Sequence, residues 1–180
     1  MIEGLRYVPD FLSPEEQRSL LEKLEAIRFD QWQQVWMRGQ LARRRKLAYG
    51  YNYEPSDRAL SPAPPIPDYL LPLRDRFAAA LGVAPETLAQ ATLTSYPPGA
   101  GIGRHKDAPF FGEPVIGVSL GSEARMIFRR GKEKVAMSLE PGSLLILSGP
   151  ARSVWTHEMP PVAAARYSIY FRSLKGAVWG

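Results

Sequence analysis

Apolar residues near the start of the chain recur with a helical period. They are spaced three or four apart and so share one face of a helix: Leu20, Leu21, Leu24 and Ile27. Ser13 is a good N-cap, Pro14 fits the first helical position and Glu16 completes a capping box. This pattern predicts a helix over residues 13–27, and a similar spacing of leucine and phenylalanine predicts a second helix over about 68–81.

The segment between the two predicted helices alternates instead. Tyr49, Tyr51 and Tyr53 occupy every second position, which in one strand points their rings to the same face. The proline-rich stretch 54–68 follows, and proline fits neither a helix interior nor a central strand. We therefore expect a strand with a tyrosine face and then an extended connection.

From about residue 91 onward the pattern is that of short β-strands. Several runs are rich in β-branched or aromatic residues and are separated by glycine, proline, serine or charges. They span residues 91–98, 114–122, 125–130, 134–140, 143–149 and 165–173. Helices followed by successive short strands indicate an α+β fold with a β-sandwich or barrel core, in a chain whose 180 residues fit one domain.

Composition narrows the class of protein. The apolar fraction of 45% and the charged fraction of 23% are ordinary for a soluble globular protein. No stretch approaches the roughly 20 apolar residues of a membrane span, and the first residues lack the basic-then-apolar pattern of a signal peptide. The chain has no cysteine, which excludes disulfides, thiolate metal sites and cysteine nucleophiles. We expect a cytoplasmic protein with no membrane partner.

The chain holds two histidines, and the first lies beside a carboxylate. His105 and Asp107 are two positions apart, so in a strand both side chains point to the same side. If His157 converges with them, two histidines and one carboxylate form the facial triad of non-haem iron(II) oxygenases. A structural zinc site would need a fourth protein ligand, which no further histidine or cysteine can supply. An H-x-D pair is also common by chance, and His157 alone is equally consistent with a buried core histidine.

A cluster of charge lies in the last predicted strand. Arg166, Ser168, Tyr170 and Arg172 alternate with apolar residues and so share one face. Buried guanidinium groups need anionic partners. Six residues of strand span ~20 Å, so two inward-leaning arginines can hold the two ends of one small dicarboxylate. A dicarboxylate that also chelates iron through a keto-acid end is 2-oxoglutarate.

These residues and their order resemble the AlkB-type iron(II)- and 2-oxoglutarate-dependent dioxygenases. The last strand, RYSIYFR, matches the family's R-x-x-x-x-x-R signature. The other segments that carry the resemblance are residues 7–21, 66–82, 93–107, 115–128 and 142–159. The resemblance implies a double-stranded β-helix (jelly roll) core with a substrate-recognition lid. We expect one dioxygenase domain over residues 1–180, with its lid at about 30–60 and its core at about 91–175.

The resemblance also implies a role for each matching residue. The implied iron ligands, which also form the catalytic centre, are His105, Asp107 and His157. The implied cosubstrate-binding residues are Thr94, Tyr96, Arg166, Ser168 and Arg172. Arg166 corresponds to the partner of the distal carboxylate of 2-oxoglutarate, and Arg172 to its partner near the metal. The family often has asparagine where this chain has Thr94 and Ser168, so one hydroxyl replaces an amide at each position. The implied cofactors are Fe(II), 2-oxoglutarate and dioxygen.

The predicted lid carries the clues to the substrate. Cations crowd the stretch 38–46, and a net charge of +5 permits a polyanionic partner without requiring one. By resemblance, the substrate-binding residues are Trp36, Arg44, Arg45, Tyr51, Tyr53 and Arg152. Arg44 stands about where repair members of the family carry an aromatic residue that stacks on the damaged base, and Trp36 is a candidate replacement. Cations for phosphates and rings for bases suit a single-stranded or flipped-base nucleic acid.

Three functions remain open at this point. The first is the oxidative demethylation or hydroxylation of alkylated bases in DNA or RNA by a monomeric enzyme. The second is an oxygenase that acts on a protein or a small molecule, in which the tyrosines form the lid core and the arginines face solvent. The third is a binding module that kept the fold without catalysis, against which the intact set of metal ligands argues.

Overall fold

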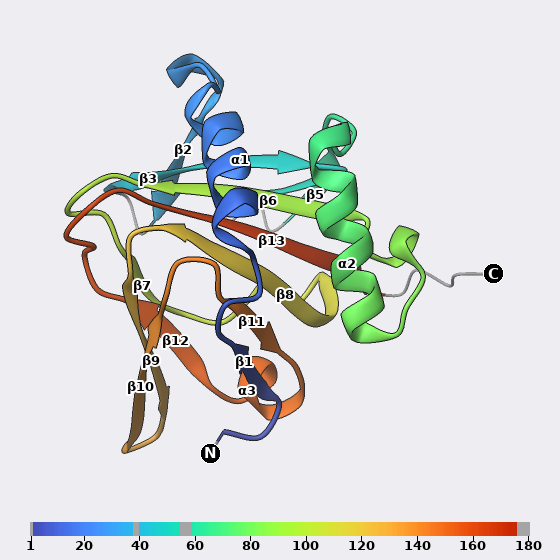
Figure 1. Ribbon diagram of the computed structural model, residues 1–180. Coiled ribbons are helices and arrows are strands. Elements are labelled where there is room, and N and C mark those ends of the chain that lie inside the picture. Colours follow the sequence, from blue (N-terminus) through green and yellow to red (C-terminus); the bar gives the residue numbers. More distant parts are fainter. Residues whose placement is uncertain (1, 38–39, 55–58, 176–180) are drawn as a thin grey trace.

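Two antiparallel sheets face each other in the computed structural model, which describes residues 2–37, 40–54 and 59–175 (Figure 1). The larger sheet consists, in spatial order, of β1 (Leu5–Val8), β11 (Leu144–Leu147), β8 (Phe111–Gly121), β13 (Arg166–Leu174), β6 (Gln90–Tyr96), β3 (Gln40–Tyr49) and β2 (Gln33–Met37). The smaller sheet consists of β10 (Glu133–Leu139), β9 (Ala124–Arg130), β12 (Thr156–Met159) and β7 (Ile102–His105). A separate hairpin consists of β4 (Tyr51–Glu54) and β5 (Ala59–Pro62).

Both predicted helices are confirmed, as α1 (Pro14–Glu25) and α2 (Leu71–Leu81). The described residues also form the short helix α3 (Gly149–Ser153) and three 3-10 turns, η1 (Phe29–Gln31), η2 (Asp68–Leu70) and η3 (Pro85–Thr87). The capping box of α1 is present: the Glu16 backbone N–H donates to Ser13 Oγ at 3.2 Å, and the Ser13 N–H donates to Glu16 Oε2 at 2.8 Å. The second helix ends at Gly82, whose φ of 68° is the left-handed conformation of a C-cap glycine.

The two faces of the larger sheet bury different side chains. On the outer face, α1 and α2 contribute Leu24 and Phe77 to a cluster with Ile169, and the Phe77 and Phe171 rings pack edge to face at 5.6 Å. Between the sheets, Phe128 of β9 belongs to a second apolar cluster. The alternation of β13 thus turns its apolar side chains toward the helices and its polar side chains toward the smaller sheet, as the sequence predicts.

The predicted tyrosine strand is broken at Gly50. Gly50 has a φ of 73°, and a Cβ there would lie 2.0 Å from the Ala89 carbonyl oxygen, so the chain turns between β3 and β4. Tyr49 therefore packs against the outer apolar cluster, whereas the Tyr53 ring contacts Phe110. The prediction that the three tyrosines share one face was wrong, because one positive-φ residue separates two strands of different direction.

The proline-rich connection also contains a strand. β5 pairs with β4 so that Tyr51 lies opposite Pro62, and proline is tolerated at such an edge position. Residues 55–58 of this connection, and Arg38 in the predicted run of cations, lie outside the described residues. None of the helices in the described ranges has the length and apolar character that crossing a membrane requires.

Candidate active site

A cavity of about 720 Å³ lies between the two sheets, within the size range of small-molecule sites. One wall is formed by the polar faces of β6 and β13 and by β3 and β4, and the opposite wall by β7, β9 and β12. The predicted site residues that line it are His105, Asp107, His157, Thr94, Tyr96, Arg166, Ser168, Arg172, Arg44 and Tyr53. The structure therefore brings the predicted metal and cosubstrate residues to one place.

The two histidines lie opposite each other on neighbouring strands. His157 of β12 pairs in register with His105 of β7, and their ring centroids are 4.4 Å apart. Burial lowers the pKa of His105, and it lowers the pKa of His157 to about 4, so both imidazoles are neutral at pH 7. His105 Nδ1 donates to the Gly103 carbonyl oxygen at 2.8 Å, which leaves the lone pair of its Nε2 available to a ligand.

Asp107 supplies a buried anionic oxygen beside the histidines. Burial raises the pKa of Asp107, but Arg172 and the two histidines lower it more, so the net pKa lies below its usual value and the carboxylate is charged. Its Oδ1 lies 3.7 Å from Arg172 Nη2, and its buried Oδ2 has no hydrogen-bond partner among the described residues. A buried acceptor without a hydrogen-bond partner destabilises the folded protein, so this oxygen needs a ligand that binds to it.

The donor set fits a divalent metal such as iron(II), which binds two neutral imidazoles and a carboxylate in facial-triad sites. His157 Nδ1 is also buried without a hydrogen-bond partner among the described residues. No group of three His, Asp or Glu side chains in the described ranges already stands in a metal-binding arrangement. Asp107 leans toward Arg172 instead, so closing on a metal requires its carboxylate to turn toward the histidines.

Arg166 is the most deeply buried charge in the cavity wall. It is 1% exposed, its Nη2 donates to Ser119 Oγ at 2.8 Å, and its guanidinium carbon lies 5.0 Å from the centre of the Tyr96 ring. Its Nε and the Ser168 hydroxyl are buried without hydrogen-bond partners, and no carboxylate of the described residues pairs with it. A buried guanidinium in this state needs an anionic ligand, and a carboxylate of 2-oxoglutarate fits that need.

Arg172 reaches from β13 of the larger sheet toward Asp107. Its Nη1 donates to Gln90 Oε1 at 3.1 Å and to Thr92 Oγ1 at 3.0 Å. Sequence reasoning missed Gln90, Thr92 and Ser119, which hold the two arginines in place. The alternation along β6 could have identified Gln90 and Thr92, because it puts them on the same face of the strand as Thr94 and Tyr96.

The mouth of the cavity combines cations with aromatic rings. On β3, Arg44 is 9% exposed and burial lowers its pKa, and Lys46 Nζ donates to Asn52 Oδ1 at 3.1 Å and to the Tyr53 carbonyl oxygen at 2.8 Å. The Tyr53 ring lies 5.8 Å from the Phe110 ring and 6.1 Å from the Phe111 ring. β3 and β4 are thus joined to the segment that follows Asp107.

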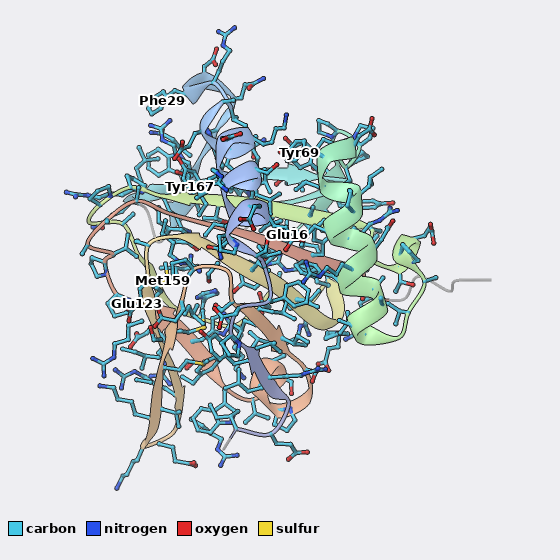
Figure 2. All side chains as sticks on the ribbon, in the orientation of Figure 1. Glu16, Phe29, Tyr69, Glu123, Met159 and Tyr167 are labelled. Atoms are coloured by element: carbon cyan, nitrogen blue, oxygen red, sulfur yellow. The ribbon has the colours of Figure 1, made fainter. Side chains whose placement is uncertain are left out.

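Four of the predicted substrate-binding residues do not line the cavity: Trp36, Arg45, Tyr51 and Arg152. Trp36 is 60% exposed, and the Arg45 guanidinium lies 3.5 Å from the centre of the Phe29 ring. Phe29 stands beyond the end of α1, far from the smaller sheet in the view of Figure 2. Successive strand residues point to opposite faces, so Arg44 enters the cavity and Arg45 does not. A role of these four residues in substrate binding stays a prediction.

Arg152 instead holds the segment that follows Asp107. From α3, its Nη2 donates to the carbonyl oxygens of Ala108 at 3.2 Å and Phe111 at 2.6 Å. Its Nη1 lies 3.6 Å from Glu113 Oε1, and Glu113 Oε2 accepts from the Gly149 N–H at 2.8 Å. We name this set of contacts the α3 clasp. It ties the Asp107 segment to the element that precedes His157.

Residues 4–172 match a protein family described as the 2OG-Fe(II) oxygenase superfamily. The chain is 31% identical over 164 residues to the tRNA (carboxymethyluridine(34)-5-O)-methyltransferase alkbh8 of Xenopus tropicalis, a match that covers 88% of the chain and 25% of the relative. It is 33% identical over 144 residues to the DNA oxidative demethylase ALKBH2 of Homo sapiens, covering 69% of the chain and 53% of the relative. The chain thus spans about a quarter of the length of the first relative and about half that of the second.

Solved structures share the arrangement of the two sheets. OsALKBH1 matches with a TM-score of 0.74 and 17% identity, over 94% of this chain and 96% of that one. A prolyl-4-hydroxylase of Pseudomonas putida matches with a TM-score of 0.69 and 11% identity, over 96% of this chain and 93% of that one. At these identities the likeness concerns the fold alone, and it confirms the predicted jelly-roll core.

Proposed function

The chain belongs to the 2OG-Fe(II) oxygenase superfamily, in its AlkB-type branch, and on this premise we propose that it demethylates or hydroxylates alkylated bases in DNA or RNA. The family's cofactors are Fe(II), 2-oxoglutarate and dioxygen. When bound together, they supply the oxidation of a C–H bond. On an N-methyl group the hydroxylated product releases formaldehyde, and on a carbon-bound group the hydroxyl remains.

In this proposal His105, Asp107 and His157 hold the iron. The support is chemical: both imidazoles are neutral, the Asp107 carboxylate is charged, and its Oδ2 has no hydrogen-bond partner among the described residues. The two histidines lie on neighbouring strands of the smaller sheet, so the distance between them is set by the strand pairing rather than by a loop.

The observation that carries the proposal is the buried Arg166 guanidinium, which faces the histidine wall across the cavity and has no carboxylate partner among the described residues. We assign Arg166 to the distal carboxylate of 2-oxoglutarate and Arg172 to the end nearer the metal. Tyr96, Thr94 and Ser168 line the same wall and offer hydroxyl groups to the cosubstrate. Apolar residues of the cavity floor, such as Met126 and Leu147, help to exclude water from the reacting centre.

The substrate side of the proposal rests on the mouth of the cavity. Arg44 and Lys46 offer positive charge and the Tyr53 and Phe110 rings offer stacking surfaces, which together suit a nucleotide taken out of its stack. The names of the two relatives refer to tRNA and to DNA. We propose a nucleic acid substrate for this chain because its sequence is similar to theirs. We further propose one domain with a lid at 30–60 and a core at 91–175, acting as a cytoplasmic monomer.

The test is turnover of methylated oligonucleotides. We expect the protein, with Fe(II) and 2-oxoglutarate, to release succinate and formaldehyde, or to add the mass of one oxygen, with a subset of methylated DNA and RNA pools. His105→Ala should abolish both products, whereas Arg45→Gln, which lies off the cavity, should retain succinate release. Equal succinate release by the wild type and His105→Ala would overturn the oxygenase proposal. Succinate release without modification of any nucleic acid would overturn the substrate and favour a protein or small molecule.

A further inference from the structure

The smaller sheet has a second face, opposite to the cavity. His105 and His157 point into the cavity, so the residues next to them on β7 and β12, Arg104 and Thr156, point outward. Across the sheet, Thr156 pairs in register with Arg129, and Arg129 pairs with Lys134. These pairings place Lys134, Arg129 and Thr156 in one row across β10, β9 and β12. Arg104 of β7 lies beside the end of this row.

Few acids offset these cations. Arg129 pairs with Glu158 at 2.9 Å, and Arg104 Nε donates to Thr156 Oγ1 at 2.7 Å. The exposed side chains of Arg125 and Lys134 have no ion pair or hydrogen bond with any described residue. Glu123 lies just beyond β9 and accepts a hydrogen bond from the Ser138 hydroxyl. We name Arg104, Arg125, Arg129 and Lys134 the basic face.

Two cations of the face oppose each other directly, and Glu158 pairs with one of them, Arg129. Lys134 lies directly opposite Arg129, and like charges at directly opposed positions of a sheet are destabilising. A polyanion laid over the sheet would remove that repulsion. Figure 2 shows the side chains of the β9–β10 hairpin standing out from the edge of the molecule, on the far side from α1. The face is therefore open to a partner.

We propose that the basic face binds the phosphate backbone of the nucleic acid strand that flanks the nucleotide in the cavity. This rests on the proposed function and names a second contact area for its substrate. Lys106 lies just after β7, lines the cavity and donates from Nζ to the Ser153 carbonyl oxygen at 2.8 Å, so positive charge continues from the mouth toward the outer face. From β7 to β10 the face spans about 15 Å, enough for several phosphates at the ~3.4 Å per nucleotide of a stacked strand.

The chemistry of the face favours a nucleic acid over a membrane surface. Binding in a membrane interface needs apolar side chains that insert among the lipids. The apolar residue at the centre of the basic face, Ile127, is only 7% exposed, and its cross-strand partner is the small Ala136. Cations around a buried isoleucine suit a backbone of phosphates, which are bound largely through charge.

The test removes two cations that lie far from the reacting centre. Arg125→Gln/Lys134→Gln is compared with Arg18→Gln/Lys23→Gln, which removes one arginine and one lysine from the exposed face of α1. Binding of a long methylated single strand of about 20 nucleotides and a short one of about three is measured over a range of salt. We expect the basic-face variant to bind the long strand about 10-fold more weakly, with a salt slope reduced by about 1 to 2. Its binding and turnover of the short strand should match the wild type.

Each outcome decides the matter. Equal losses in the two double variants would mean that only net charge acts, which overturns the basic face. A basic-face loss that is equal for long and short strands would place the contact in the cavity and overturn it as well. Loss of binding to anionic phospholipid vesicles, with no loss on the long strand, would assign the face to a membrane instead. Failure of the wild type to oxidise either strand overturns the proposed function, while the salt slopes of the long strand still report on the face.

Discussion

Arg166 combines almost complete burial with a guanidinium that the described residues leave without a carboxylate. We predict that Arg166→Met lowers the affinity for 2-oxoglutarate by about 100-fold, because charge-assisted hydrogen bonds to a buried carboxylate are lost. The binding constant can be measured calorimetrically with Mn(II) in place of iron. The same variant should not lower the thermal stability of the free protein, since a methionine of similar length removes a desolvated charge.

Arg45→Met is the matched control for this prediction, because Arg45 stacks on Phe29 outside the cavity. It should bind 2-oxoglutarate as the wild type does. Unchanged affinity in Arg166→Met would contradict the assignment of this arginine. A large loss of thermal stability would instead indicate a structural role for Arg166, held through Ser119.

The residues that sequence reasoning identified are those whose chemistry is tied to their type. Histidine and aspartate at metal spacing and paired arginines on one strand carry a function that few other residues supply. Gln90 and Ser119 form ordinary hydrogen bonds that many residues can form, so nothing in their type marked them. Neighbouring residues such as Arg44 and Arg45 point to opposite faces of a strand. Which of the two faces the cavity depends on pairing with strands that are distant in the sequence.

The α3 clasp acts as an element, since one short helix holds the segment between Asp107 and β8. We predict that Arg152→Met destabilises the protein by about 2–3 kcal/mol, because two carbonyl oxygens and Glu113 lose a charged donor. Hydrogen exchange should accelerate at residues 108–111, and affinity for Mn(II) should fall while the cavity residues stay intact. Arg18→Met, at an exposed site on α1, is the control. If Arg152 contacted the substrate directly instead, Arg152→Met would weaken substrate binding and leave hydrogen exchange in this segment unchanged.

The start of α1 provides a pH-dependent contact. The hydrogen bond with the Ser13 backbone lowers the pKa of Glu16, burial opposes this, and Arg76, whose Nη1 donates to Glu16 Oε1 at 2.6 Å, lowers it further. A lowered pKa in the folded state means that the stabilisation is present at neutral pH and is lost as the pH falls through that pKa. Glu16→Gln should therefore cost about 0.5–1 kcal/mol at pH 7 and nothing once Glu16 is protonated. Chemical unfolding at several pH values measures this, with the exposed Glu22→Gln as control.

Elements were predictable where they were long enough to show a period. The cap and the apolar stripe predict α1, and composition and alternation predict the long strands β8 and β13. β7 and β12 have four residues each, which is too short for a period to stand out, although they carry both histidines. The break at Gly50 depends on the approach of the Ala89 carbonyl from another element, which no local pattern contains.

At the scale of the whole molecule, the site joins the two sheets. The histidines belong to the smaller sheet, whereas Arg166 and Arg172 belong to β13 at the centre of the larger one. A metal and a cosubstrate that contact each other would therefore link the sheets across the cavity. We predict that Mn(II) and 2-oxoglutarate, each at about 100 times its Kd, together raise the melting temperature by about 10 to 20 °C.

The form of this stabilisation distinguishes a shared site from two separate ones. If the ligands meet in the cavity, 2-oxoglutarate should stabilise the protein strongly only when Mn(II) is present, because each ligand completes the binding site of the other. Asp107→Asn should then lose the response to both ligands, and Arg166→Met should keep the response to Mn(II) and lose that to 2-oxoglutarate. Simply additive shifts, or a full 2-oxoglutarate response in Arg166→Met, would mean that the cosubstrate binds elsewhere. Thermal unfolding under anaerobic conditions measures all of these shifts, since without dioxygen the ligands are not consumed.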